Sequence, residues 1–331
     1  MSTARRLLLS SQVLALHGGA LRAAAQGAAV EFVVLEEAHA DASQTVDAAF
    51  ISRDITGLST KHVAQPALLE CYAVLRRSPA LAWVHTHSAG ADRPVYAELR
   101  ARGVAVTTSS GANAQVVAHS ALAGLLALAR RLPALMQAQR ERRWAPLQAG
   151  PAPRDLAGQT AVLVGWGPIA RALQPLLALL GMSVVVVRRS AQAAGPGIET
   201  VSFEQLHQVL PRADALLLAC PLNAQTRGLI NAAALRAMPP ASCLVNVSRG
   251  EVVVQDALVD ALQSGQLAGA YLDVFEHEPL PAASALWALP GVIVTPHSAG
   301  YSDSHSPRVL AQFCDNLRRW LHGEALAHRV N

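Results

Sequence analysis

One glycine-containing turn constrains the fold of this chain more than any other feature. Gly165-Trp166-Gly167-Pro168-Ile169-Ala170 follows an apolar run, residues 161–164, and opens an apolar helical pattern that continues to Leu180 and ends at Gly181. A second apolar run, residues 184–187, follows. The order of strand, tight turn, helix and strand predicts a βαβ unit.

The residue types in this turn suit a dinucleotide. The first glycine, Gly165, allows the tight turn, Gly167 lets the backbone approach a pyrophosphate, and Ala170 is small enough for the helix to pack closely on the strand. The N-terminus of the following helix supplies N–H groups and a partial positive charge for the phosphates. The motif therefore predicts a dinucleotide-binding domain.

The end of the second strand indicates which dinucleotide. An NAD site carries an acid about 20 residues after the first glycine, but this chain has Arg188, Arg189 and Ser190, the first of them 23 positions after Gly165. A carboxylate repels a 2′-phosphate, whereas guanidinium groups pair with it. We expect a preference for NADP(H), with NAD(H) as the alternative cofactor; the arginines could also be a solvated strand end.

Size and composition exclude several classes of protein. With 331 residues, 52% hydrophobic and 15% charged, the chain is long enough for two globular domains. Its net charge of +4 comes without a basic, aromatic-rich block, so no nucleic-acid partner is expected. Cysteines without a CxxC pair favour a reducing compartment, and the most apolar helical segment, residues 121–129, is too short for a membrane. We expect a cytoplasmic protein.

The first 108 residues alternate between β-rich runs and helical patterns, which predicts parallel βαβ units. The loop His87-Ser88-Ala89-Gly90-Ala91-Asp92 follows one of these strands, and its small residues leave backbone N–H groups able to hold a carboxylate, although an ordinary turn is the alternative. His85 and His87 share a strand face but lack a third ligand, so no metal site is predicted. The expected strands are residues 6–10, 31–35, 48–51, 81–84 and 104–107, and the clearest helices are residues 66–77 and 95–102.

A long helical pattern, residues 113–140 with a kink at Pro133, precedes a proline-containing linker, so the chain is expected to enter a second domain near residues 108–118. Beyond the glycine turn, we expect strands at residues 200–203, 215–219, 243–247, 268–272 and 292–294, and helices at residues 204–210 and 232–238.

Three polar stretches each follow an apolar strand of this second domain: Asn246 to Gly250, Asp273 to Pro279 and Thr295 to Gly300. Ligands of open parallel sheets bind outside the carboxyl ends of the strands, so these stretches should converge near the cofactor.

The side chains in these stretches suit reduction of a 2-oxo acid. Arg249 can pair with the substrate carboxylate and polarise its carbonyl group, and His297 can donate a proton to the oxygen as hydride reaches the carbon. Glu278 would orient the imidazole and favour its protonated form. Glu276 is a rival for that acidic role, and alone His297 would more often be an ordinary surface or core histidine.

These motifs resemble those of the D-isomer-specific 2-hydroxyacid dehydrogenase family from about Leu81 to the C-terminus. The 29-residue spacing from Arg249 to Glu278 and the stretch Trp287-Ala288-Leu289-Pro290 before Thr295-Pro296-His297 follow the pattern of that family. So do Cys220-Pro221-Leu222, the stretch from Thr226 to Asn231 and the terminal segment from Asn316 to Trp320.

The resemblance implies an α/β fold of two Rossmann-like, doubly wound parallel-sheet domains, with the active site in the cleft between them. Residues 1–110 and 303–331 would form the substrate (catalytic) domain and residues 111–302 the dinucleotide-binding domain. The last helix would pack back on the first domain, and the protein would be a homodimer.

The resemblance also assigns roles to residues. Arg249, Glu278 and His297 would be catalytic, and the backbone of Ala89 and Gly90 would hold the substrate carboxylate. Asp273 would suit the nicotinamide carboxamide, whereas His119 departs from the family, where a Glu is common. The cofactor-binding residues would be Gly165, Gly167, Pro168, Ile169, Arg188, Arg189, Ser190, Cys220, Pro221, Thr226, Val247, Ser248, Asp273 and Gly300.

The sequence thus predicts an enzyme that transfers a hydride from NADPH to a small 2-oxo acid, of the glyoxylate or hydroxypyruvate class, and produces the D-2-hydroxy acid. An NAD-dependent D-lactate-type dehydrogenase is one alternative. A cofactor-sensing binding protein on the same fold is another, although binding alone does not require an acid–base histidine paired with a carboxylate.

Overall fold

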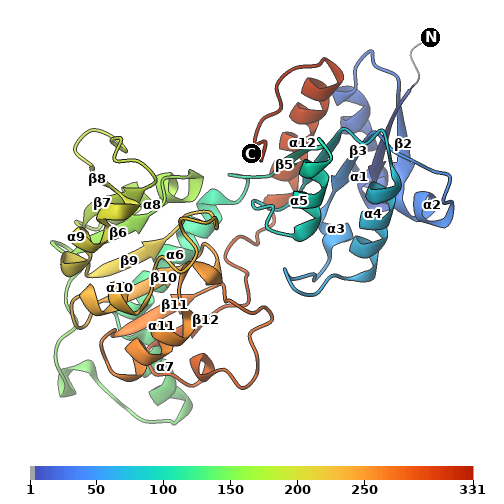
Figure 1. The fold of residues 1–331 in the computed structure, drawn as a ribbon. Helices are drawn as coiled ribbons and strands as arrows, with labels where there is room; N and C mark the ends of the chain where they lie inside the picture. The colour runs from blue at the N-terminus through green and yellow to red at the C-terminus, as the bar shows by residue number, and fades with distance from the viewer. Residues whose placement is uncertain (1–3, 331) are drawn as a thin grey trace. The chain divides into compact units, whose positions relative to one another are not determined.

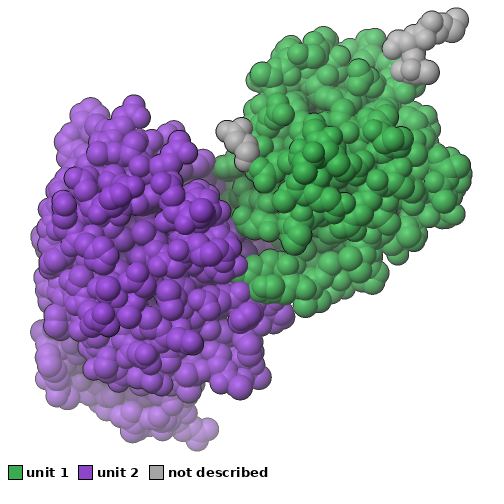
Figure 2. Space-filling model, in the orientation of Figure 1, with its two compact units in different colours: residues 1–113, 302–331 green, residues 114–301 purple. Residues whose placement is uncertain are grey.

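A computed structural model describes residues 4–330 of the chain. The chain forms two compact units, which Figure 2 distinguishes by colour: unit 1 contains Met1–Asn113 and Ser302–Asn331, and unit 2 contains Ala114–Tyr301. The chain therefore enters unit 2 after Asn113 and returns to unit 1 at Ser302. No helix within residues 4–330 is both long enough and apolar enough to span a membrane.

Unit 1 is built on a five-stranded parallel sheet with the order β2-β1-β3-β4-β5. The order reverses between β1 and β3, which is where ligands bind in doubly wound sheets. The strands are β1 (Arg5–Leu9), β2 (Val30–Val34), β3 (Ala48–Ile51), β4 (Trp83–Thr86) and β5 (Ala105–Thr108).

Alternate side chains of each strand of unit 1 face opposite layers of helices. Leu7 and Leu9 pack with α1 (Ser11–Ala24) and α12 (His305–Leu321) on one face. Leu8 packs on the other face, which is covered by α2 (Leu35–Ala40), α3 (Arg53–Thr56), α4 (Pro66–Arg77) and α5 (Pro94–Ala101). The C-terminal helix α12, red in Figure 1, thus completes the same unit as the blue N-terminal strands.

Unit 2 is built on a seven-stranded parallel sheet with the order β12-β11-β10-β9-β6-β7-β8. Apart from β12, this is the strand order of dinucleotide-binding sheets, and it reverses between β6 and β9. The strands are β6 (Thr160–Val164), β7 (Ser183–Arg188), β8 (Glu199–Ser202), β9 (Ala215–Leu218), β10 (Cys243–Asn246), β11 (Gly269–Leu272) and β12 (Val292–Val294).

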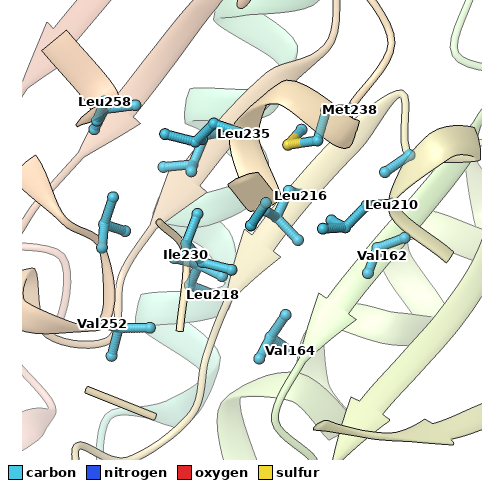
Figure 3. Close-up of a cluster of buried hydrophobic side chains, with 14 of the residues drawn as sticks. Val162, Val164, Leu210, Leu216, Leu218, Ile230, Leu235, Met238, Val252 and Leu258 are labelled. Atoms are coloured by element: carbon cyan, nitrogen blue, oxygen red, sulfur yellow. The ribbon is translucent and has the colours of Figure 1, made fainter. Parts of the chain in front are cut away.

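Helices also cover both faces of this second sheet. Helices α6 (Ala114–Ala129) and α8 (Pro168–Leu179) bury one face. The other face packs against α9 (Leu206–Val209), α10 (Ala232–Ala237) and α11 (Gln255–Gln263), and Figure 3 shows part of this core around Leu216 and Leu218. Two doubly wound parallel α/β sheets, the predicted fold class, are therefore confirmed.

The single helix predicted over residues 113–140 is wrong. It is broken between α6 and α7 (Leu132–Arg140) at Arg131, whose φ of 52° is left-handed. Pro133 lies in the first turn of α7, where its missing N–H costs no helical bond. The proline therefore starts a new helix rather than kinking an existing one.

The helix predicted over residues 204–210 is shorter than expected, because short 3-10 turns flank α9 on both sides. The 3-10 turns of the structure are η1 (Leu147–Ala149), η2 (Phe203–Gln205), η3 (Leu210–Arg212), η4 (Gly250–Val252) and η5 (Ala285–Trp287).

Candidate active site

The turn after β6 requires its first glycine. Gly165 has a φ of 104°, and a Cβ atom built there would lie 2.6 Å from the backbone oxygen of Ala219, which follows β9. The Gly165 amide also donates to the Val187 carbonyl at the end of β7. Gly165 therefore lets three strand ends meet where the strand order reverses.

The second glycine leaves open space in front of a helix N-terminus. A Cβ atom on Gly167 would meet nothing within 4 Å. Pro168 is the first residue of α8, and Ala170 is fully buried against the sheet. Because the first N–H groups of a helix have no intrahelical acceptor, this turn fits a pyrophosphate.

The arginine pair lies on the strand next to this turn. Arg188 is the last residue of β7 and is half-buried, while Arg189 and Ser190 are exposed. Because Val164 pairs with Val187 in the sheet, Arg188 at the end of β7 lies at the level of Gly165, which follows β6. The side chains of Arg188, Arg189 and Ser190 are thus at the carboxyl ends of the strands, where the glycine turn also lies.

The hydroxyl group of Thr226 forms hydrogen bonds within the loop that follows β9. Thr226 is fully buried, and its Oγ1 donates to the Pro221 carbonyl at 2.7 Å and accepts from the Asn223 amide at 2.9 Å. Cys220 is buried, and burial raises the pKa of its thiol to about 12. Thr226 therefore shapes this loop, and a contact of its hydroxyl with a cofactor stays a prediction.

Asn246, to which the sequence analysis assigned no role of its own, shapes the segment after β10. Asn246 Oδ1 accepts from the backbone amide and the hydroxyl of Ser248, and its Nδ2 donates to the Arg249 carbonyl at 3.0 Å. A Cβ atom on Gly250 would lie 1.8 Å from the carbonyl carbon of Phe275. The segment after β10 therefore packs directly against the segment after β11. The signal in the sequence was an amide that ends an otherwise apolar strand. Val247, between these residues, is buried.

Glu278 and His297 come from adjacent strand ends and are bonded to each other. The imidazole Nδ1 of His297 lies 2.8 Å from Glu278 Oε2, and Glu278 Oε1 accepts from the backbone amide of Phe275. Glu278 is buried, whereas the side chain of His297 is 49% exposed. The carboxylate thus fixes the ring through Nδ1, and proton exchange at Nε2 stays a prediction.

The rival carboxylate, Glu276, has another partner. Its Oε1 accepts from the backbone amide of Gln255 at 3.0 Å, at the start of α11, and the Gln255 side chain accepts from the Glu276 amide at 3.4 Å. Glu276 therefore ties the segment after β11 to α11.

The buried Asp273 holds the segment that carries His297. Its Oδ1 accepts from Thr295 Oγ1 at 2.6 Å and from the backbone amide of Ser298 at 2.8 Å, and both oxygens accept from the Ala299 amide. His297 itself has a φ of 51°, and its amide donates to the Asp273 carbonyl. The segment ends at the half-buried Gly300. A contact of Asp273 with the nicotinamide carboxamide stays a prediction.

The predicted carboxylate loop belongs to unit 1, where it follows β4 with Ala89 exposed and Gly90 half-buried. The ring of the preceding His85 contacts the hydroxyl groups of Thr107 and Ser109 at 2.8 and 3.0 Å, which assigns it to the packing of the sheet. Within residues 4–330, no group of three or more His, Cys, Asp or Glu side chains is placed to hold a metal ion.

Arg249, Glu278 and His297 thus follow β10, β11 and β12, three neighbouring strands, at the sheet edge that carries the glycine turn. This combination defines a nicotinamide-dependent oxidoreductase.

Comparison with known proteins gives the family. Residues 122–299 match the model of the D-isomer specific 2-hydroxyacid dehydrogenase, NAD binding domain. The chain belongs to the D-isomer specific 2-hydroxyacid dehydrogenase family and is a dehydrogenase of that family, with a nicotinamide cofactor.

Relatives that act on different substrates have similar sequence identity to this chain. The chain is 37% identical to the (S)-sulfolactate dehydrogenase of Chromohalobacter salexigens over 75% of this chain and 80% of the relative. It is 34% identical to the glyoxylate reductase of Korarchaeum cryptofilum over 78% of each chain. A solved NADPH-dependent glyoxylate/hydroxypyruvate reductase from Sinorhizobium meliloti, in complex with NADP and malonate, has a TM-score of 0.75 and 29% identity, with 99% of this chain and 97% of that chain covered.

Proposed function

We propose that this dehydrogenase prefers NADPH and reduces small 2-oxo acids of the glyoxylate or hydroxypyruvate class to the D-2-hydroxy acid. The observation that carries the proposal is the 2.8 Å bond between Glu278 and His297, because a binding protein needs no imidazole held by a buried carboxylate.

The proposal assigns tasks to the cofactor, to His297 and Arg249, and to the loop after β4. Bound NADPH supplies the hydride that reaches the carbonyl carbon of the substrate. The hydride brings two electrons and one proton to the carbonyl carbon. His297 donates a second proton from Nε2 to the carbonyl oxygen. Arg249 pairs with the substrate carboxylate and polarises the carbonyl group, while the backbone of Ala89 and Gly90 holds the carboxylate from unit 1. In the oxidation direction, His297 takes the proton back.

The choice of NADPH rests on the end of β7. Arg188 and Arg189 occupy the position at which an NAD site carries an acid that binds the ribose. Such an acid would repel a 2′-phosphate, whereas the two guanidinium groups attract it, and Ser190 adds a hydroxyl donor. The reductase from Sinorhizobium meliloti, which is described as NADPH-dependent, supports the same choice.

The proposal is tested by the oxidation of NADPH and, in parallel, of NADH with glyoxylate, hydroxypyruvate, pyruvate and phenylpyruvate. We expect the highest kcat/KM with NADPH and one of the two small acids. An Arg188→Asp variant should shift the ratio of kcat/KM for NADPH over NADH towards NADH by about tenfold or more, since it replaces an attraction to the 2′-phosphate with a repulsion. Faster turnover of phenylpyruvate, or a preference for NADH in the native enzyme, would contradict the proposal.

We also propose a homodimer in the cytoplasm. Leu132 and Met136 on α7 and the nearby Trp144, which is 95% exposed, are apolar side chains suited to a partner subunit. The cysteines within residues 4–330 are free thiols, as suits a reducing compartment. Sedimentation of the purified enzyme would test the dimer.

A further inference from the structure

Unit 1 contains a cavity of about 280 Å³ at the point where its strand order reverses. It lies between the N-terminal halves of α1 and α12 and reaches the residues that follow β3 and β4. Its lining residues are Gln12, Val13, Leu16, His17, Phe50, Ser52, Arg53, Asp54, His87, His305, Ser306, Val309 and Leu310. The side formed by α1 and α12 mixes apolar and polar side chains, whereas the residues after β3 and β4 are all polar. One of the polar side chains of α12 is His305, whose ring centroid lies 6.3 Å from that of His87.

Two buried polar side chains line this cavity without a hydrogen-bond partner. Ser52 is 3% exposed and His87 is 6% exposed. Within residues 4–330, no group pairs with Ser52 Oγ or with either ring nitrogen of His87. The neighbouring His85, by contrast, has hydroxyl partners for both nitrogens. A buried polar atom without a partner costs about 1–3 kcal/mol, so Ser52 and His87 are expected to pair with something that enters the cavity.

The two side chains match a hydroxyl group better than an anion. Burial, helped by the charge of Arg53, lowers the pKa of His87 to about 3, so the imidazole is neutral near pH 7. One nitrogen of a neutral imidazole donates and the other accepts, and the Ser52 hydroxyl can do both. An oxyanion only accepts and would leave the accepting nitrogen unpaired. Arg53 and Asp54 add one charge of each sign to the rim.

The cavity is also close to the proposed carboxylate loop along the chain. Ala89 follows His87 by two residues, so their Cα atoms are at most about 7 Å apart. The cavity has about nine times the volume of one liquid water, which is about 30 Å³. Glyoxylate carries only a hydrogen beyond its carbonyl carbon, so it would leave this space and the polar atoms unused.

We propose that this cavity is the side-chain pocket of the enzyme, in which Ser52 and His87 bind a hydroxyl group on the third carbon of the substrate. The inference rests on the proposed function and narrows it: the preferred substrates are 3-hydroxy-2-oxo acids, of which hydroxypyruvate is the smallest, rather than glyoxylate or pyruvate.

The test uses two substrates that differ only in this hydroxyl group. We expect the kcat/KM of the native enzyme for hydroxypyruvate to exceed that for pyruvate by tenfold or more. A His87→Leu variant should lower this ratio about tenfold, and Ser52→Ala should lower it in the same direction. His87→Gln keeps a donor and an acceptor and should retain most of the ratio. Ser43→Ala, in an exposed loop of the same unit, is the control and should leave the ratio as in the native enzyme.

Two outcomes would overturn the inference while leaving the proposed function intact: a native ratio near one, or a ratio that His87→Leu does not change. Removing an unpaired buried group can raise the melting temperature, so a stabilised His87→Leu enzyme with an unchanged ratio would show that His87 only packs.

If no 2-oxo acid is turned over, the proposed function fails, and calorimetry of the full chain with NADPH still tests the pocket. D-glycerate and D-lactate differ by the same hydroxyl group. Tighter binding of D-glycerate that is lost in His87→Leu would support the pocket, and equal binding would overturn it.

Discussion

Replacing Glu278 by Gln would test the bonded pair at the candidate active site most directly. The change keeps the size of the side chain and an oxygen for the Phe275 amide, but it removes the negative charge 2.8 Å from the His297 ring. The ring then loses the partner that holds a proton on Nδ1 and fixes the orientation of the imidazole.

The size of the effect follows from the surroundings of the pair. A hydrogen bond to a charged group contributes about 1.5–3 kcal/mol. Glu278 is buried, but the His297 side chain is 49% exposed, so water screens the pair and a value of about 2 kcal/mol is appropriate. That corresponds to a decrease in kcat of about thirtyfold. The KM for the 2-oxo acid should change by less than about threefold, since Glu278 acts through His297.

Glu276→Gln is the matched control, because it makes the same chemical change two residues away on a carboxylate that bonds Gln255. Steady-state NADPH oxidation with hydroxypyruvate should show a kcat near that of the native enzyme for the control. Equal kcat values for Glu278→Gln and the native enzyme, or an equal decrease in both variants, would refute the assignment of Glu278 to His297.

Two further predictions concern the fold. Gly250→Ala should destabilise the protein by about 3 kcal/mol or more in urea unfolding, because the new Cβ would lie 1.8 Å from the Phe275 backbone, whereas Gly167→Ala should fold normally and bind NADPH more weakly. Burial lowers the pKa of His85 and His87 to about 3, so between about pH 6.5 and pH 3 the unfolded chain binds protons that the folded chain does not. The free energy of unfolding should therefore fall as the pH drops through this range, by about 1.4 kcal/mol per pH unit for each histidine, and His87→Leu should make the slope shallower by about that amount; an unchanged slope would contradict the burial of His87.

The sequence by itself determined the fold class, because the glycine turn and the apolar runs are local patterns with one compatible arrangement. Residues 165–170 join β6 to α8 as expected, and the strand at residues 48–51 and the helix at residues 66–77 have the predicted bounds. The break at Arg131 was missed, because a proline in a helical pattern fits a kink as well as a new first turn.

The tertiary structure decided between two acids that the local residue pattern left as rivals and of which the family resemblance favoured Glu278. The strand β12 pairs with β11 and brings His297 to Glu278, whereas Glu276 accepts a hydrogen bond from the Gln255 amide at the start of α11. The tasks of Asn246 and Asp273 likewise depend on backbone amides and carbonyl groups whose positions a sequence does not state.

The cavity of unit 1 is the clearest case. His85 on β4 and His87 just after this strand look alike in the sequence. In the structure, His85 contacts hydroxyl groups of the next strand and its loop, and His87 lines an open space between α1 and α12. The two histidines differ because the hydrogen-bond partners of His85 lie more than 20 residues away along the chain. Only the folded sheet brings those partners to the ring.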